Sequence, residues 1–294
     1  MWTRVGIGAL NAIEYVLQDA AFAGNEALKT YATRSHSRVH GWLTREAIAL
    51  TLATFAMQHD FSLNGSVAEI GVHHGRLLIL LGLARARADP LLAIDLFGQQ
   101  EENTSRSGRG SLARFQENLG LHAQGSGDDC IILEANSMKL NSEDLLNAVN
   151  RQKFRLFSVD GGHTAECAQH DMTIAFGSLT DGGVVVLDDY FNYQWPGVSE
   201  GVMRFALANE DNVIPFAIGG NKVLFTTSRE WHSRYLAAIR ERLGIFRSKK
   251  SRFLGVEVFV LEEILQRHKK AKGGILRRTG RSIRSRLRTP RSAR

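Results

Sequence analysis

Short apolar runs alternate with stretches of helical periodicity from residue 67 onward. The apolar runs cover residues 67–70, 91–94, 131–133, 154–159 and 184–187, and the helical stretches between them cover 76–88, 112–121, 142–149 and 165–179. Strands that alternate with helices form βαβ units and a parallel sheet. The runs are apolar at nearly every position, which is typical of strands covered on both faces. The pattern therefore predicts an α/β fold built on a parallel sheet.

The pattern changes toward the end of this region. Two apolar runs, 213–218 and 223–227, are separated by Gly219-Gly220-Asn221-Lys222, which predicts an antiparallel hairpin. Pro215 weakens the first run or places it at a sheet edge. A helix over 230–243 and an accessory strand over 253–261 follow. We therefore expect a mostly parallel sheet that ends in an antiparallel pair.

Residues 1–60 have the periodicity of helices. An apolar stripe with helical spacing consists of Leu10, Ile13, Val16, Leu17 and Ala20. The polar residues Glu14 and Asp19 interrupt the same stretch, and such residues are costly in a bilayer core. It is therefore predicted as an amphipathic helix and not as a membrane span or a signal peptide. A second helix is predicted over 44–57, with Thr44 as its N-cap.

The formal net charge of +7 is not spread evenly along the 294 residues. Residues 266–294 hold twelve basic residues and no acidic one. They are Arg267, Lys269, Lys270, Lys272, Arg277, Arg278, Arg281, Arg284, Arg286, Arg288, Arg291 and Arg294. The other 25 Lys and Arg residues face 30 acidic residues, so residues 1–265 carry about −5. This predicts a mildly acidic body, unlike a nucleic-acid-binding surface, and a basic, disordered tail.

Cysteine usage points to a reducing compartment. Cys130 and Cys167 are the two cysteines of the chain, and both fall in predicted regular structure beside apolar residues. Buried free thiols are the expectation for such positions. We therefore predict a cytoplasmic protein without a disulfide framework.

A strand, a tight turn and a helix follow one another near residue 70. The turn reads Glu69-Ile70-Gly71-Val72-His73-His74-Gly75. Its glycines let the backbone approach a ligand beside a helix N-terminus, but the spacing is not that of dinucleotide folds or phosphate loops. A carboxylate here repels a pyrophosphate and suits a cationic amino group. We therefore assign Glu69, Gly71 and Gly75 to a cofactor site, and expect His73 and His74 to face solvent.

Polar residues at the ends of the next two strands extend this site. Asp95 lies 26 residues after Glu69, where an acid can accept hydrogen bonds from both ribose hydroxyls of a nucleoside. Asn136 and Ser137 close the third apolar run. Either side chain is expected to meet the edge of an adenine.

Together these motifs resemble the class I S-adenosylmethionine-dependent methyltransferases. The stretches at 159–164 (VDGGHT) and 181–190 (DGGVVVLDDY) are more specific, and they resemble the bacterial macrocin O-methyltransferase-like group, which modifies sugar hydroxyls. The resemblance covers residues 65–230. It implies a Rossmann-like sheet with adjacent fourth and fifth strands, S-adenosylmethionine as cofactor, and a loop over the active site at 95–110. Arg76 departs from the family, in which small residues are commoner at this position.

Three acidic residues end the fourth and fifth strands. They are Asp160, Asp188 and Asp189. Neighbouring strands lie about 4.8 Å apart, so these carboxylates converge at one edge of the sheet. They repel one another unless a cation or protons neutralise them, and Mg²⁺ with oxygen ligands is the natural solution. The resemblance implies the same three ligands, with Asp160 also counted in the cofactor site; the alternative is that these acids only cap strands and start a turn.

The implied reaction is an in-line transfer of the sulfonium methyl group to an alcohol. A metal ion lowers the pKa of a bound hydroxyl, and a base then removes its proton. Histidine, with an unperturbed pKa of about 6.5, suits that role. The resemblance supports His163 as the base, and its alternative role is to hold the turn by hydrogen bonds. The aromatic residues Tyr190, Phe191, Tyr193 and Trp195 either stack on a sugar ring or pack beneath the next helix.

The sequence thus predicts a magnesium-assisted O-methyltransferase that acts on a hydroxyl of a sugar, glycan or natural product. An RNA methyltransferase guided by the basic tail and a non-catalytic cofactor-binding partner in a biosynthetic complex stay open as alternatives. We expect a helical lid or dimer face over 1–60, a methyltransferase domain over 61–262 and the basic tail over 263–294. The tail either contacts anionic surfaces, membranes included, or is a solvated extension. The acceptor and a homo-oligomeric state are left open.

Overall fold

The computed structural model describes residues 11–104, 106–123, 125, 127 and 129–262. The predicted basic tail and the first ten residues lie outside this part of the chain. The described strands form one nine-stranded sheet in the order β3-β2-β1-β4-β5-β7-β6-β9-β8. These strands are β1 Ser66–Ile70, β2 Leu91–Asp95, β3 Cys130–Glu134, β4 Phe154–Val159, β5 Leu179–Leu187, β6 Ile214–Gly219, β7 Lys222–Thr226, β8 Ser248–Phe253 and β9 Val256–Leu261.

Strands β1 to β5 are parallel to one another, and β7 runs antiparallel to both β5 and β6. The predicted mostly parallel sheet with a terminal antiparallel pair is therefore confirmed. β4 and β5 are neighbours, as the resemblance implied. The carboxyl ends of all five parallel strands consequently lie along one edge of the sheet.

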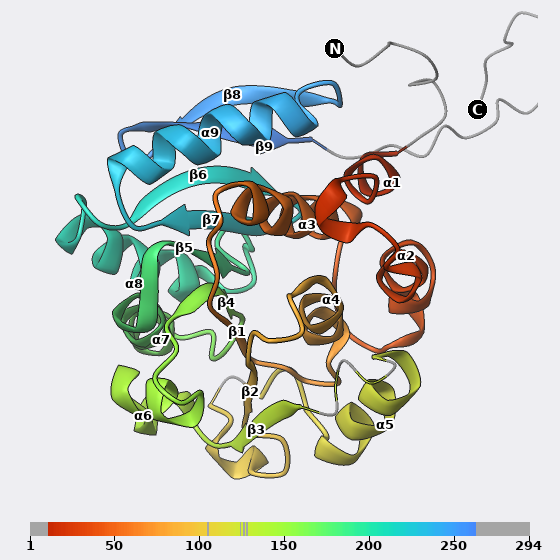
Figure 1. Cartoon of the computed structure of the whole chain (residues 1–294). Helices are drawn as coiled ribbons and strands as arrows, with labels where there is room; N and C mark the ends of the chain where they lie inside the picture. Colours follow the sequence, from red (N-terminus) through yellow and green to blue (C-terminus); the bar gives the residue numbers. More distant parts are fainter. Residues whose placement is uncertain (1–10, 105, 124, 126, 128, 263–294) are drawn as a thin grey trace, which may run out of the picture. The chain divides into compact units, whose positions relative to one another are not determined.

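Helices cover both faces of this sheet (Figure 1). The helices are α1 Ala12–Val16, α2 Glu26–Thr33, α3 Arg45–Asp60, α4 Arg76–Ala84, α5 Leu112–His122, α6 Ser142–Ala148, α7 Ala165–Ser178, α8 Pro196–Ala208 and α9 Arg229–Leu243, with 3-10 turns at Ala20–Phe22, Ser35–Arg38, Gln100–Glu102 and Ser137–Lys139. One hydrophobic cluster joins α1 to α5 and α9 to the sheet, and a second joins α6, α7 and α8 to the opposite face. The helices over 12–60 therefore share a core with the sheet.

Local sequence signals set where several helices begin. The side chain of Thr44 accepts a hydrogen bond from the amide of Ala47, as its prediction as the N-cap of α3 requires. Asn11 and Asn141 start α1 and α6 with reciprocal capping boxes. Helix α3 is almost entirely buried between α1, α9 and β6. Its all-round apolar surface is what a helix needs when it is enclosed on every side.

The edge position offered for the run with Pro215 was wrong, and the accessory strand predicted over 253–261 is confirmed in part by β9. Strand β6, which carries Pro215, is not at an edge, because β9 pairs with it at Ala217 and Ile218. The pairing of β6 with β7 shifts register just after Pro215, and this irregularity accommodates the missing N–H group. The accessory strand predicted over 253–261 is a hairpin of β8 and β9, whose turn residues Leu254 and Gly255 both have positive φ.

No helix in the described ranges is long and apolar enough to cross a membrane. The apolar stretch predicted as an amphipathic helix lies partly outside the described residues. Its described part forms the short helix α1 and the following 3-10 turn. Ala12, Ile13 and Val16 are buried against the core, so the apolar stripe is satisfied by packing.

Candidate active site

A cavity of about 500 Å³ opens along the carboxyl edge of the parallel strands. Its walls include Gly71 after β1, Asp95 at the end of β2, and Asn136 and Ser137 after β3. Asp160 after β4 and the Asp188-Asp189 pair after β5 complete this edge, and His163 adds an imidazole. Most of the predicted site residues therefore line one cavity.

The glycines of the β1–α4 turn are required by packing as well as by backbone conformation. Gly71 has φ of +86°, and a Cβ atom there would lie 1.7 Å from the carbonyl oxygen of Asp160. Gly75 has φ of +88°, and its Cβ atom would lie 2.6 Å from the ring of Phe115. Only glycine fits both conditions. Gly71 thus brings the ends of β1 and β4 together under the cavity, and Gly75 starts α4 outside the cavity wall.

The Asp95 carboxylate is held in place by backbone amides. The amide of His73 donates to Oδ2 at 2.7 Å, and the amide of Phe97 donates to Oδ1 at 2.6 Å. Burial raises the pKa of Asp95, while these two hydrogen bonds act in the opposite direction. Each oxygen keeps further acceptor capacity toward the cavity. This arrangement suits a carboxylate that accepts hydrogen bonds from a pair of ligand hydroxyls.

Glu69 does not line the cavity, contrary to its assignment as a cofactor residue. It lies in the middle of the sheet, between β2 and β4, and is 2% exposed. Burial raises its pKa from an ordinary value near 4.5 to about 8. Its Oε2 atom has no hydrogen-bond partner among the described residues. Burial thus favours the neutral form of Glu69, and its position between two neighbouring strands separates it from the cavity.

Asn136 and Ser137 lie at the cavity wall, but the amide of Asn136 already has partners. Its Nδ2 atom donates to Glu102 at 2.8 Å, and its Oδ1 atom accepts from the amide of Met138 at 3.0 Å. Glu102 belongs to the loop that follows β2, and several residues of that loop line the cavity. Asn136 thus ties this loop to the end of β3. No local pattern predicts this contact, because its two residues lie 34 positions apart.

A buried lysine enters the acidic cluster, and sequence reasoning missed it. Nζ of Lys222 lies 2.7 Å from Oδ2 of Asp188. Burial alone would lower the pKa of Lys222, but the Asp188 and Asp160 carboxylates outweigh it and raise that pKa above its usual range. Burial and Asp188 also raise the pKa of Asp160 well above its ordinary value. The chain itself therefore supplies a cation to these carboxylates.

The sheet register explains why Lys222 is there. Leu187 and Val223 are paired across β5 and β7, so the residue before Val223 faces the residue after Leu187. The sequence placed Lys222 in the hairpin loop, where a charge is unremarkable. This contact could have been predicted from one feature of the sequence. Lys222 begins β7, which runs antiparallel to β5, and the acid pair follows the end of β5.

His163 and Asp189 form a second pair at this edge. Nε2 of His163 lies 3.2 Å from Oδ2 of Asp189, and the imidazole stacks on Trp195 with ring centroids 4.3 Å apart. Asn192 and Asn221 donate to Oδ1 of Asp189 at 2.9 and 2.6 Å. Burial raises the pKa of Asp189, but the hydrogen bonds from these neighbours prevail and lower it. The Asp189 side chain is thus a fixed, ionised acceptor that orients His163.

The structure gathers a different metal-ligand set from the predicted one. Among the described residues, one ligand atom each from Asp160, His163 and Asp189 lie within 4.8 Å of one another. Asp188 is not in this group, since its carboxylate is ion-paired with Lys222. The predicted set of three aspartates thus differs from the structure at Asp188. The reason is that the antiparallel strand β7 brings the charge of Lys222 to this carboxylate.

The aromatic residues after the acid pair divide between the two predicted roles. Tyr190 is buried against Phe253, and it therefore packs in the core. Trp195 lines the cavity and stacks on His163. Phe191 is 54% exposed and Tyr193 is 90% exposed. Trp195 is consequently the residue of this group that lines the cavity.

The N-terminal part of the chain supplies another wall of the cavity. Trp42, Leu43 and Thr44, which precede α3, all line it. The guanidinium of Arg76 donates to the carbonyl of Gly41 and holds this segment against the β1–α4 turn. The carbonyl of Arg76 in turn accepts a hydrogen bond from Tyr31 at 2.9 Å. The departure from the family at Arg76 thus has a structural role.

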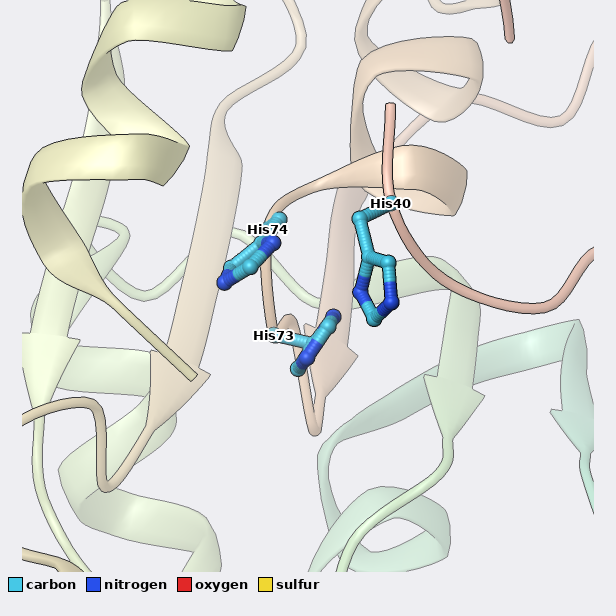
Figure 2. A group of neighbouring side chains, drawn as sticks. All are labelled: His40, His73 and His74. Carbon is cyan, nitrogen blue, oxygen red and sulfur yellow. The ribbon is translucent and has the colours of Figure 1, made fainter. Parts of the chain in front are cut away.

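His73 and His74, which were expected to face solvent, are only partly exposed and lie beside His40 (Figure 2). Their rings stack on one another with centroids 4.0 Å apart, and the His40 ring is 5.2 Å from His73 and 5.5 Å from His74. Burial and the neighbouring imidazoles lower the pKa of His73 to about 4, although the His40 backbone acts in the opposite direction. Burial and His40 also lower the pKa of His74.

Comparisons with known proteins agree with this geometry. Residues 68–190 match the model of a family described as a methyltransferase domain. The solved structure of the O-methyltransferase NovP is 15% identical, covers 61% of this chain and 79% of its own, and gives a TM-score of 0.50. CalS11, a TDP-rhamnose 3'-O-methyltransferase of calicheamicin biosynthesis, is 17% identical over 69% of this chain and 92% of its own, with a TM-score of 0.47. No curated protein sequence matches the chain.

The sheet order and the solved structure of NovP define a Rossmann-like fold, and residues 68–190 match a methyltransferase domain. The matched region contains β2 to β5 and most of β1, together with the turn and the acid pair. The match over residues 68–190, together with this fold, supports a class I S-adenosylmethionine-dependent methyltransferase. The resemblance to the macrocin O-methyltransferase-like group agrees with these comparisons.

Proposed function

We propose that the protein transfers the methyl group of S-adenosylmethionine to a hydroxyl group of a sugar, a glycan or a related natural product. One observation carries the proposal: a single cavity joins the cofactor turn at Gly71 and Asp95 to the His163–Asp189 pair. A methyl donor bound at the Gly71 end of the cavity would thus face an acceptor hydroxyl that lies beside His163. An enzyme gains most when both reactants are held in the geometry of the reaction.

The cofactor end of the cavity suits a nucleoside. The Asp95 carboxylate, fixed by the amides of His73 and Phe97, is placed to accept both ribose hydroxyls. The Gly71 turn lets the backbone approach the amino-acid part of the cofactor closely. S-adenosylmethionine supplies the electrophilic methyl group, and the chain supplies its position.

His163 is the base in this proposal. Asp189 accepts the hydrogen on Nε2 and thereby leaves Nδ1 as the nitrogen that takes a proton from the acceptor hydroxyl. Nδ1 is buried and has no hydrogen-bond partner among the described residues. The ring must therefore turn, or the adjacent chain must shift, as the acceptor enters. Trp195 stacks on the imidazole and limits that movement to its own plane.

The acidic end of the cavity fits a divalent cation in part. Asp160 and Asp189 offer carboxylate oxygens of the type that Mg²⁺ prefers, while Lys222 neutralises Asp188. Asp160 and Asp189 would hold the ion, with water completing its ligands. A bound Mg²⁺ polarises a hydroxyl group and lowers its pKa. The close approach of ligand atoms from Asp160, His163 and Asp189 is the observation that favours a cation here, because it places donors for one ion within 4.8 Å of one another.

The first test is calorimetric titration of the full chain with S-adenosylhomocysteine, with and without magnesium. We expect saturable binding at about one molecule per chain. Transfer of a labelled methyl group to a panel of sugars, glycans and RNA then identifies the acceptor class. Binding with transfer to RNA alone would replace the sugar proposal by the RNA alternative. Binding without transfer to any acceptor, in the presence of magnesium, would favour the non-catalytic alternative.

A further inference from the structure

We propose that His40, His73 and His74 form a binding site for a zinc ion at the mouth of the cofactor cavity, separate from the acidic cluster. One ring nitrogen from each histidine lies within 4.8 Å of the other two. The three rings come from two parts of the chain that are more than 30 residues apart in sequence. Figure 2 shows the His40 ring directed toward the two rings of the β1–α4 turn.

The chemistry of the three side chains selects the ion. Neutral imidazole is a ligand for zinc, copper and nickel, whereas magnesium and calcium prefer oxygen ligands. Three histidines with a water molecule in the fourth position are a known zinc arrangement. Zinc–nitrogen bonds of about 2.0–2.1 Å require the ligand atoms to draw together by at most about 1.5 Å. The His73 and His74 rings must also turn out of their stacked arrangement, because an imidazole nitrogen binds an ion in the plane of its ring. His40 is exposed, so its side chain is free to turn inward.

The local structure holds the three histidines together for no other evident purpose. His73 has φ of +56°, a conformation that costs free energy in a residue other than glycine and is often found at functional positions. Its Nδ1 atom is buried and interacts with the His40 backbone, but without the geometry of an ordinary hydrogen bond. Arg76 fixes Gly41, and so keeps His40 beside the turn. An ion would give the buried nitrogen a partner.

The position of the site gives the ion a structural effect on the cofactor cavity. His40 precedes Trp42, Leu43 and Thr44, which line the cavity, and the amide of His73 donates to Asp95. A bound ion therefore joins the N-terminal wall of the cavity to the turn that holds Asp95. We expect it to act as a clamp and to take no part in methyl transfer.

The test uses the full chain without an affinity tag and in excess magnesium, which occupies sites built from oxygen ligands. Zinc is titrated in competition with a chromophoric chelator. We expect one tightly bound zinc ion per chain in the wild type. H40A and H74A should bind it at least about tenfold more weakly, because even partners behind the ligands contribute about 10–100-fold. Circular dichroism checks that both variants are folded.

Two control variants separate this site from others. His59 is an exposed histidine outside the cluster, so H59A should bind zinc like the wild type. D189N disables the acidic cluster and should also leave zinc binding unchanged. The proposal is overturned if the wild type takes up no zinc, if H40A and H74A bind it as tightly as the wild type, or if D189N loses it.

A spectroscopic measurement gives an independent answer. The Trp42 ring lies 6.0 Å from both the His40 and His73 rings. Copper, which imidazoles bind strongly, should quench part of the tryptophan fluorescence at one equivalent, and W42F should lack that part. Equal quenching in W42F would place the copper elsewhere and count against the site.

A last measurement rests on the proposed function. Zinc should increase the affinity for S-adenosylhomocysteine a few-fold in the wild type and leave it unchanged in H40A. If S-adenosylhomocysteine does not bind in any condition, the proposed function fails, while the zinc titration still decides the metal site. If it binds and zinc has no effect on its affinity, the clamp is wrong and the site alone is retained.

Discussion

At the scale of single residues, the environment decides which acidic group in this site is neutral and which is charged. Asp189 is stabilised as a carboxylate by hydrogen bonds from His163, Asn192 and Asn221. Glu69, only a few residues from the cofactor turn, is driven toward its neutral form by burial. The same side-chain chemistry thus serves to orient the His163 imidazole in one place and to fill the interior of a sheet in another.

Replacement of His163 tests its role as base. We expect H163A to reduce the turnover number by about 10²–10⁴-fold, which is the usual contribution of a general base. The dissociation constant for S-adenosylhomocysteine should change by less than about threefold, because His163 lies at the acceptor end of the cavity. Steady-state kinetics and calorimetry measure the two quantities. Turnover near the wild-type value would remove His163 from the mechanism.

Glu69 predicts a pH dependence of stability. Its pKa rises from about 4.5 to about 8 on folding, so the folded state retains a proton that the unfolded state releases. The contribution is fully present below pH 4.5 and is lost as the pH rises toward 8. E69Q replaces the ionisable carboxylic acid by a neutral amide, so this fall in stability with rising pH should be absent in the variant. We therefore expect the free energy of unfolding of E69Q, relative to wild type, to increase by on the order of a few kcal/mol between pH 5 and pH 8.

Urea unfolding at several pH values measures this difference. Glu241 is exposed on α9, so E241Q serves as the matched control and should follow the wild-type profile. Parallel profiles for E69Q and wild type would show that Glu69 is ionised in the folded protein. Its burial would then need another compensating charge.

At the scale of elements, two contacts between distant segments build the site. The β6–β7 hairpin brings Lys222 against the end of β5, and α4 brings Arg76 against the segment before α3. Neither contact follows from the periodicity of the segment that carries it. In each contact a basic side chain, Lys222 or Arg76, lies beside a segment that is distant from it in sequence.

The Lys222–Asp188 pair should be required for stability. Removal of one partner of a buried ion pair leaves an uncompensated charge and costs about 3–5 kcal/mol. We therefore expect K222M to lower the free energy of unfolding by about this amount. D188N in the same chain should restore part of the loss, because it removes the charge that Lys222 had neutralised. Equal destabilisation in the single and double variants would indicate that Lys222 acts through packing alone.

Arg76 should affect cofactor binding without being in the cavity wall. A hydrogen bond from a charged donor contributes about 1.5–3 kcal/mol, and here it holds Gly41 and the segment that follows it. We expect R76A to weaken the binding of S-adenosylhomocysteine by about tenfold. R87A, at an exposed position beyond the C-terminus of α4, is the control. Unchanged affinity in R76A would show that the N-terminal wall does not contribute to the cofactor site.

At the scale of the whole molecule, the charge is divided between an acidic body and a basic tail. Twelve basic residues in 266–294 would each contribute about 1 kcal/mol near an anionic membrane surface. We expect the full chain to co-sediment with vesicles that contain anionic lipid at about 0.05 M salt and to be released at about 0.5 M. A chain that ends at Ile264 should stay in solution. Equal sedimentation of both chains would reject the tail as the contact.

The sequence by itself determined the element order and most of the residues at the cavity edge. Buried parallel strands are apolar throughout, and ligands meet the sheet where such strands end, so Gly71, Asp95, Asp160 and Asp188 could be found from local pattern alone. Glu69 could not, because adjacent residues of a strand point to opposite faces and the pattern does not say which face is closed. Its assignment to the cavity therefore failed.

Only the tertiary structure decided which charges meet. Lys222 and His40 reach the site from segments far away in sequence, and Arg76 donates a hydrogen bond to Gly41, which lies 35 residues before it. These contacts depend on strand register and on the path of the chain before α3. The accessory hairpin of β8 and β9 likewise depends on a two-residue turn and on pairing with β6. The periodicity of a segment indicates whether a residue is buried, but it does not indicate which residues lie beside it across the sheet. In this protein, those neighbouring residues determine the charges in the cavity.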